Sequence, residues 1–132
     1  MLVPDANKPI PDAVLAKSRE PQAQPVAIHA IEAWQRWMQG DALFIDVRHG
    51  EERLGGKVIP DALHIPFRLG ATLALNPDFI AELTHLLTYD RGIIMVCNSG
   101  WRSQEAATQA LAAGFRRVYY ICDGLNGEGF PR

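Results

Sequence analysis

A short polar loop joins a buried-strand pattern to a helix pattern in the second half of this chain, and this junction restricts the possible folds most. The four apolar residues 93–96 are rich in branched side chains, which predicts a buried strand. Residues 103–113 then carry alanine and leucine at helical spacing, and Gly114 stands where a helix would end. The sequence therefore predicts a strand, a tight loop and a helix in direct succession.

The same alternation of strand and helix patterns continues through the rest of the chain. Apolar residues at helical spacing in 28–40 and 76–87 predict two further helices. Strands that alternate with helices indicate an α/β fold with a largely parallel sheet. In such a sheet, ligands bind at the carboxyl ends of the strands, where Cys97 is expected. The further predicted strands are 43–47, 62–65 and 118–121.

The helix pattern of residues 28–40 carries several large apolar side chains. We expect these side chains to pack against the core rather than to form a binding surface. Gly40 follows them as the residue that ends the helix. The side chains are Ile31, Trp34, Trp37 and Met38.

Composition argues against several classes of function. The chain has 132 residues, enough for one domain with a tail, and its net charge of −2 gives no electrostatic reason to bind nucleic acid or an anionic membrane. No apolar run approaches the roughly 20 residues that span a bilayer. Two cysteines are too few for a disulfide framework, and the four histidines show no zinc-ligand spacing. These counts therefore predict no zinc site.

The first 25 residues differ from the rest of the chain. They contain five of the nine prolines, which predicts a Pro-rich N-terminal extension (1–25) ahead of a folded domain (26–132). The N-terminus lacks the charged start and apolar stretch of a secretory signal peptide. This predicts a cytoplasmic protein, although a periplasmic protein whose signal peptide had been removed would give the same sequence.

The loop after the strand at 93–96 carries residues suited to nucleophilic chemistry. Backbone N–H groups and the positive end of the helix dipole would favour the thiolate of Cys97. Gly100 permits a backbone conformation in which successive N–H groups point inward, and Arg102 adds a charged hydrogen-bond donor for an oxyanion. A cysteine at a strand end is often only a small buried side chain, but the three residues together predict a nucleophile in an anion-binding loop.

Four segments of the chain carry, in order and in spacing, the motifs of one known family. They are residues 43–48 with Glu51 and Glu52, residues 59–66, the loop 97–103, and residues 114–124. Over about residues 26–128 they resemble the rhodanese domain, a sulfurtransferase fold. The resemblance implies a three-layer α/β domain with a central, mostly parallel five-stranded sheet flanked by helices.

The resemblance also implies an enzyme, a thiosulfate sulfurtransferase of the rhodanese type. The Cys97 thiolate would attack the outer sulfur of thiosulfate or a similar donor, sulfite would leave, and a persulfide would remain on Cys97. Cyanide or a thiol would then accept the sulfur, and the chemistry that the resemblance implies requires neither a metal nor an organic cofactor. The partners implied are these small molecules and, further, a protein acceptor, with no nucleic acid and no membrane. The substrate-binding residues implied are Asn98, Ser99, Gly100, Trp101 and Arg102.

Other residues are expected to support the loop. Asp46 ends a predicted strand near the active edge, where it could touch substrate, but we favour a structural role in which it pairs with Arg48 or accepts loop N–H groups. Ser103 follows the loop and is a further supporting residue. We expect Cys122, at the end of the last strand, to be a small buried side chain. The alternative is a resolving cysteine that attacks the persulfide and forms a disulfide.

Two alternatives to the sulfurtransferase stay open. Related phosphatase and arsenate-reductase folds use a loop one residue longer, so the six residues from Cys97 to Arg102 favour sulfur over phosphate as the target. The main alternative is a persulfide carrier or protein-interaction module with little turnover of small molecules. The bulky Trp101 and the Pro-rich extension motivate it. The sequence names neither the physiological donor nor the acceptor.

Overall fold

The computed structural model describes residues 22–50, 59, 61–69, 74–98, 100–122 and 124, and the statements below concern these residues. The helices are α2 (Ala30–Met38), α4 (Phe79–Leu86) and α5 (Trp101–Ala113). The strands are β1 (Val26–Ile28), β2 (Ala42–Asp46), β3 (Leu63–His64), β4 (Arg68–Leu69), β5 (Ala74–Leu75), β6 (Gly92–Val96) and β7 (Val118–Ile121).

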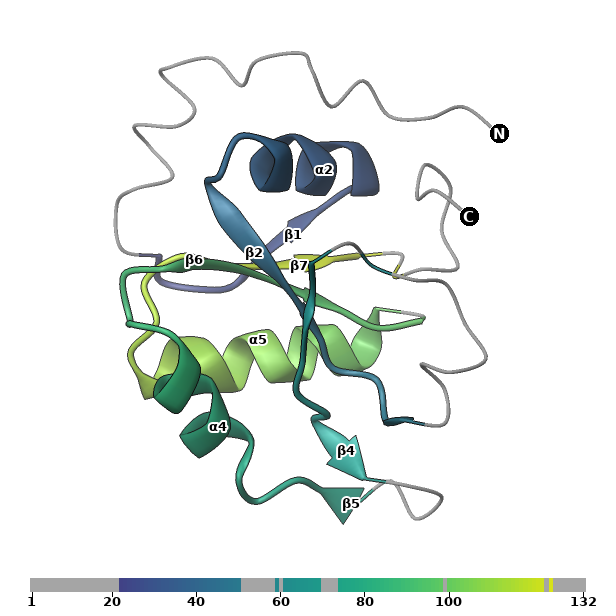
Figure 1. The fold of residues 1–132 in the computed structure, drawn as a ribbon, viewed down its shortest axis with the longest axis vertical. Coiled ribbons are helices and arrows are strands. Elements are labelled where there is room, and N and C mark those ends of the chain that lie inside the picture. Colours follow the sequence, from purple (N-terminus) through teal and green to yellow (C-terminus); the bar gives the residue numbers. More distant parts are fainter. Residues whose placement is uncertain are drawn as a thin grey trace.

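A five-stranded sheet forms the centre of the structure (Figure 1). Its strand order is β1-β7-β6-β2-β3, and every pair of neighbouring strands is parallel. The predicted parallel sheet is thus confirmed. β6 lies at its middle and all five of its residues are buried, which explains why this strand reads as a continuous apolar run rather than an alternating one. β4 and β5 pair separately as a short antiparallel ribbon that the sequence did not indicate.

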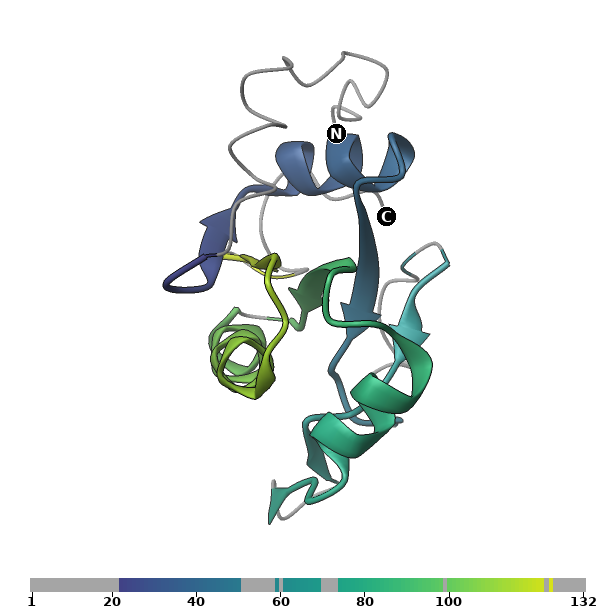
Figure 2. The same ribbon diagram turned by 90° about the vertical axis from the view of Figure 1, so that its left-hand side faces the viewer.

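Helices cover both faces of the sheet, so the predicted three-layer arrangement is also confirmed. Figures 1 and 2 show α2 on one face and α4 with α5 on the other. On the α2 face, Ala30 and Ala33 pack with side chains of β6 and β7. On the other face, Leu83 of α4 and Ala106 of α5 pack against Met95 of β6. Each layer therefore buries one apolar side against the sheet.

The side of α2 that meets the sheet is only partly the predicted one. Trp34 and Trp37 pack against this core as expected, and Ala30 and Ala33 are buried there as well. Ile31 and Met38, expected to face inward, are each 50% exposed, so the prediction was wrong for them. The buried set follows the spacing i, i+3, i+7 from Ala30, and its two small residues let the helix backbone approach the sheet closely.

Arg36 is the polar member of the buried side of α2. Its guanidinium donates to Glu32 at 2.9 Å and to Asp41 at 2.7 Å, and its guanidinium carbon lies 4.4 Å from the centroid of the Tyr119 ring. Burial alone would lower the pKa of Arg36, but the hydrogen bonds to Asp41 and Glu32 outweigh it and raise the pKa above its usual value. Arg36 thus ties α2 both to the turn before β2 and to β7.

The N-terminal edge of the sheet contains a strand that was not predicted separately. β1 has three residues, too few for a recognisable pattern, and pairs with β7. Just before it, Gln22 donates its backbone N–H to Arg116 O at 3.1 Å, and its side-chain oxygen accepts the Val118 N–H at 2.9 Å. The domain boundary after residue 25 stays a prediction. Among the described residues, no helix has the length and apolarity to cross a bilayer.

Candidate active site

Cys97 directly follows β6, and its sulfur faces the beginning of α5. Its Sγ accepts hydrogen bonds from the backbone N–H of Gly100 at 3.1 Å and of Ser103 at 3.4 Å. The side chain is fully buried, with 0% of its surface exposed. Both donors belong to the end of the loop or the first turn of α5, where the helix dipole is positive. The environment at Sγ is therefore one that stabilises negative charge on sulfur.

Two glycines allow the loop to pack against the chain that follows β7. Gly100 has φ +97°, and a Cβ there would collide with the carbonyl oxygen of Cys122. Gly124 has φ +62°, and a Cβ there would collide with the carbonyl group of Asn98. Only glycine fits both the positive φ and the close approach. The strand–loop–helix turn is thus held against the end of β7 through backbone contacts.

Ser103 contacts Cys97 through both its backbone and its side chain. Its hydroxyl donates to Gly100 O at 2.8 Å, and the Cys97 thiol donates to Ser103 Oγ at 3.5 Å. Ser103 is fully buried. Sequence reasoning ranked it only as a supporting residue, because its position after Arg102 does not reveal that its N–H reaches the sulfur.

Trp101 lies beside two arginines at the start of α5. Its side chain is 48% exposed, and the guanidinium carbons of Arg102 and Arg68 lie 5.8 Å and 5.7 Å from the ring centroid. Arg102 is buried, whereas Arg68 on β4 also forms an ion pair of 2.9 Å with Glu105. Sequence reasoning missed Arg68, because it meets α5 only through the tertiary fold. The rim of the loop therefore combines an accessible aromatic ring with positive charge.

Asp46 and Arg48 form a buried ion pair at the end of β2. The Arg48 guanidinium donates to both carboxylate oxygens of Asp46, at 2.9 and 2.8 Å, and the Arg48 N–H donates to the same carboxylate at 3.1 Å. Neither side chain is more than 1% exposed. His64 Nε2 lies 2.6 Å from Arg48 O and links β3 to the same corner. The pairing that the sequence favoured for Asp46 is present.

The remaining predicted residues fall into three groups. Asn98 is half-buried, next to Gly124. Ser99 and the motif residues Glu51 and Glu52 lie outside the described residues. Cys122, expected to be buried, is only partly buried, because the chain leaves the sheet there, and its Sγ lies 3.5 Å from Nδ1 of His29.

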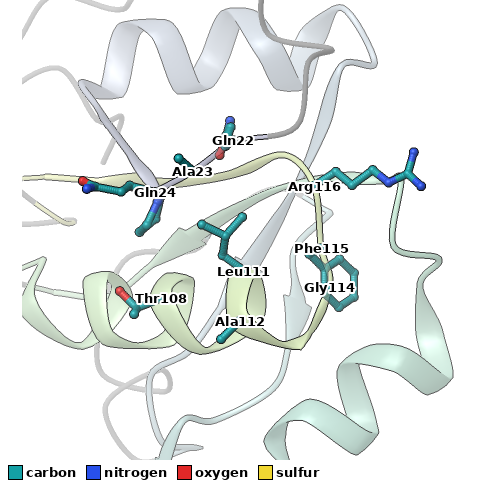
Figure 3. Close-up of a pocket in the computed structure, with 10 residues that line it drawn as sticks. Gln22, Ala23, Gln24, Thr108, Leu111, Ala112, Gly114, Phe115 and Arg116 are labelled. Carbon is teal, nitrogen blue, oxygen red and sulfur yellow. The ribbon is translucent and has the colours of Figure 1, made fainter.

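A pocket of about 470 Å³ lies along the C-terminal half of α5 (Figure 3). Leu111 and Phe115 line it from the helix side, and Gln22 lines it from the segment before β1. None of its lining residues is one that the sequence predicted for the site. The pocket is therefore separate from the Cys97 loop.

The family model described as Rhodanese-like domain matches residues 29–127, three quarters of the chain. The chain belongs to the rhodanese-like domain family. The match includes every described residue of the Cys97 loop, both glycines that pack against it, and the Asp46–Arg48 pair. The resemblance noted from the four motifs is therefore confirmed.

Individual relatives agree with this family. The chain is 35% identical over 93 residues to Thiosulfate sulfurtransferase 16, chloroplastic, from Arabidopsis thaliana, a match covering 67% of this chain and 77% of that protein. It is 31% identical over 85 residues to Protein HIGH ARSENIC CONTENT 1, mitochondrial, also from Arabidopsis thaliana, covering 63% of this chain but only half of that protein. The crystal structure of Rv0390 from M. tuberculosis aligns with a TM-score of 0.64 at 28% identity, covering 82% and 88% of the two chains. The first of these relatives is named as a sulfurtransferase, which agrees with the sulfurtransferase family.

The close approach at Gly100 gives a test of the loop geometry. We expect Gly100→Ala to displace the loop from Cys122, to move the Gly100 N–H away from Cys97 Sγ, and to lower the free energy of unfolding by more than about 2 kcal/mol. Urea unfolding measures the stability, and the alkylation rate of Cys97 reports its environment.

Gly40→Ala is the matched control for that substitution. Gly40 also has a positive φ, +73°, but its Cβ would meet no atom within 4 Å. Gly40→Ala should therefore lower the free energy of unfolding only by the backbone strain, about 1 kcal/mol, and should leave the Cys97 alkylation rate unchanged. Equal effects of the two substitutions on both readouts would show that the contact with Cys122 does not shape the loop.

The buried ion pair gives a second test. Asp46→Asn keeps the shape of the side chain but removes the charge opposite the buried guanidinium of Arg48, so we expect a loss of about 3 kcal/mol in urea unfolding. Glu32→Gln is the control, because Glu32 is 42% exposed and its buried partner Arg36 keeps the ion pair with Asp41, so this substitution should cost less than about 1 kcal/mol. A loss for Asp46→Asn no greater than the control would contradict a structural role for the pair.

Proposed function

We propose that this protein is a sulfurtransferase that carries a sulfane sulfur on Cys97 and transfers it from thiosulfate or a similar donor to cyanide or a thiol. The observation that carries the proposal is the position of the Cys97 sulfur, which accepts the N–H groups of Gly100 and Ser103 at the start of α5. Membership of the rhodanese-like domain family and the name of the chloroplastic thiosulfate sulfurtransferase relative support it. The Cys97 loop supplies the nucleophile and its environment.

The first half-reaction forms the persulfide. The thiolate of Cys97 attacks the outer sulfur of thiosulfate and forms a new S–S bond, while the donor's own S–S bond breaks. Sulfite leaves with the electron pair of that bond, so no external oxidant or reductant is required. The Gly100 and Ser103 N–H groups, which face the thiol sulfur, also offer donors to the negative charge of the persulfide.

The second half-reaction transfers the outer sulfur from Cys97 to the acceptor. Cyanide or an acceptor thiolate attacks the outer sulfur of the persulfide, and Cys97 leaves as the thiolate. The same N–H groups that stabilise the nucleophile make it a good leaving group in this step. Because the donor product leaves before the acceptor reacts, ping-pong kinetics follow.

Arg102 is the proposed binding residue for an anionic donor. Its guanidinium is always charged and can pair with the sulfonate oxygens of thiosulfate. It lies at the end of the loop, next to Trp101, whose ring forms part of the exposed rim. The ion pair with Arg102 reduces the repulsion between the negatively charged donor and the thiolate that attacks it.

Persulfide loading tests the proposal directly. After incubation with thiosulfate and removal of the donor, the intact mass of the wild type should rise by at least one sulfur atom, and cyanide should reverse the change. Cys97→Ser should gain no sulfur and should lower turnover to background, because it removes the nucleophile. Cys122→Ser is the matched control and should still load.

The donor panel must extend beyond thiosulfate, since the proposed chemistry is common to several sulfane donors. Mercaptopyruvate and inorganic polysulfide are the further donors to test. A wild-type protein that gains no sulfur from any of them would overturn the proposal. Hydrolysis of an aryl phosphate that depends on Cys97 would instead assign phosphatase chemistry to the loop.

A persulfide carrier that serves a protein acceptor is the second candidate function. The observation that favours it is Trp101, a half-exposed ring beside Arg68 at the loop rim, near the exposed Leu69 of β4. An accessible aromatic side chain with neighbouring cations is typical of protein-binding surfaces. In this case Cys97 would load fully but turn over slowly with cyanide.

Trp101→Ala distinguishes the two functions. A carrier should lose transfer to a protein thiol, for example the free thiol of serum albumin, by about tenfold or more, while transfer to cyanide stays unchanged. An enzyme for small molecules should show rapid turnover with thiosulfate and cyanide and no selective effect on the protein acceptor. Leu86→Ala, at an exposed site on α4, is the control for general surface effects.

A further inference from the structure

A second thiol with a neighbouring base lies beside the candidate active site. Cys122 follows the last residue of β7, and its Sγ is 3.5 Å from Nδ1 of His29, the residue before α2. Neither Cys97 nor Cys122 is in a disulfide. A thiol within hydrogen-bond reach of an imidazole nitrogen is the arrangement in which histidine accepts the proton and leaves a nucleophilic thiolate.

The strand register places this thiol at the level of Cys97. In β6 and β7 the last paired residues are Met95 and Tyr120, so the register continued by two residues sets Cys97 opposite Cys122. In β1 and β7, Ile28 pairs with Ile121, which sets His29 opposite Cys122. Adjacent strands are about 4.8 Å apart, a separation that the side chains of two cysteines can bridge.

Backbone contacts beyond the strands support this placement. A Cβ on Gly100 would collide with the Cys122 carbonyl oxygen, and a Cβ on Gly124 would collide with the Cys97 carbonyl oxygen. The two chain segments therefore stay side by side after the strands end. They run past each other at the distance of direct backbone contact.

The two thiols differ in accessibility. Cys97 is fully buried, so a large acceptor cannot bring its own thiol to the sulfur without opening the loop. Cys122 is partly exposed, and His29 beside it is exposed. A sulfur atom moved from Cys97 to Cys122 would pass from the interior to the surface within the width of one strand.

We propose that Cys122 is a relay residue, which takes the sulfane sulfur from Cys97 with His29 as the base and presents it to acceptors at the surface. This rests on the proposed function of Cys97. His29 Nδ1 accepts the proton of the Cys122 thiol, and the thiolate attacks the outer sulfur of the Cys97 persulfide. The S–S bond of that persulfide breaks, and its electron pair stays on Cys97 Sγ. The products are the Cys97 thiolate and a Cys122 persulfide, so no other reactant is consumed.

The environment of Cys97 favours this direction of attack. The Gly100 and Ser103 N–H groups point at Cys97 Sγ and stabilise the charge that it carries on leaving. Attack on the inner sulfur would instead expel hydrosulfide and close a disulfide between the two cysteines. That reaction is the competing outcome, and it ends transfer rather than continuing it.

Peptide mapping after limited loading tests the relay. The full chain is incubated with less than one equivalent of thiosulfate, trapped with iodoacetamide and digested with trypsin, which separates the two cysteines because Arg102 and Arg116 lie between them. We expect the persulfide on the Cys97 peptide at early times and on both peptides later. In Cys97→Ser neither peptide should carry it, and in Cys122→Ser it should stay on the Cys97 peptide.

The role of His29 has a readout that does not depend on turnover. In the Cys97→Ser background, His29→Gln should lower the rate at which iodoacetamide alkylates Cys122 by about tenfold at neutral pH, since a thiol without a base is only a few per cent ionised there. The same substitution in the wild type should slow the appearance of sulfur on Cys122. His85→Gln, at an exposed site on α4, is the control and should change neither rate.

The possible results distinguish a failure of the relay from a failure of the proposed sulfurtransferase function. No sulfur on Cys97 with any donor would remove the proposed function itself. A loaded Cys97 whose sulfur never reaches Cys122, a disulfide formed with release of sulfide, or direct loading of Cys122 in Cys97→Ser would each overturn the relay alone. Transfer to a protein thiol that falls about tenfold in Cys122→Ser, with transfer to cyanide unchanged, would support it.

Discussion

The parallel pairing of β6 with β2 on one side and β7 on the other is the constraint on which the site depends. Parallel neighbours all end at the same edge of a sheet, so the residues that follow each strand gather there. Asp46 at the end of β2, Cys97 after β6 and Cys122 after β7 therefore meet at one edge, although they are far apart in the sequence. Because β6 is buried on both faces, the position of Cys97 along this edge is fixed by the core itself.

A buried thiol that serves as a nucleophile needs partners for its negative charge. Here the partners are backbone N–H groups, which cost no side-chain ordering and cannot rotate away. Their direction depends on the positive φ of Gly100 and on the contact of the loop with the chain after β7. The Asp46–Arg48 pair closes the neighbouring corner with charges that neutralise each other. The pair therefore adds no net charge to this edge of the sheet.

Local patterns predicted those parts of the fold that depend on local chemistry. The apolar runs of β6 and β7 are strands because each residue is covered on at least one face, and α5 follows its alanine spacing. The prediction for α2 was correct for Trp34 and Trp37 but wrong for Ile31 and Met38. Large apolar side chains suggest burial, whereas the sheet also buries the small Ala30 and Ala33. β1 has too few residues for a pattern of its own and exists through its pairing with β7. Residues paired across these two strands are far apart in the sequence, so no local sequence pattern reveals the pairing.

By itself the sequence determined that a cysteine stands between a buried strand and a helix, with a glycine and an arginine at fixed spacing after it. These features depend on residues that are neighbours along the chain, so the sequence could reveal them, and with the flanking motifs they identify the rhodanese-like family. Only the tertiary structure decided that Ser103 reaches the sulfur, that Arg68 lies beside Trp101, and that Cys122 meets His29, 93 residues earlier. The contacts of Arg68 with Trp101 and of Cys122 with His29 arise from strand register and helix placement. These are properties of the packed core as a whole and leave no local pattern at the residues that they join.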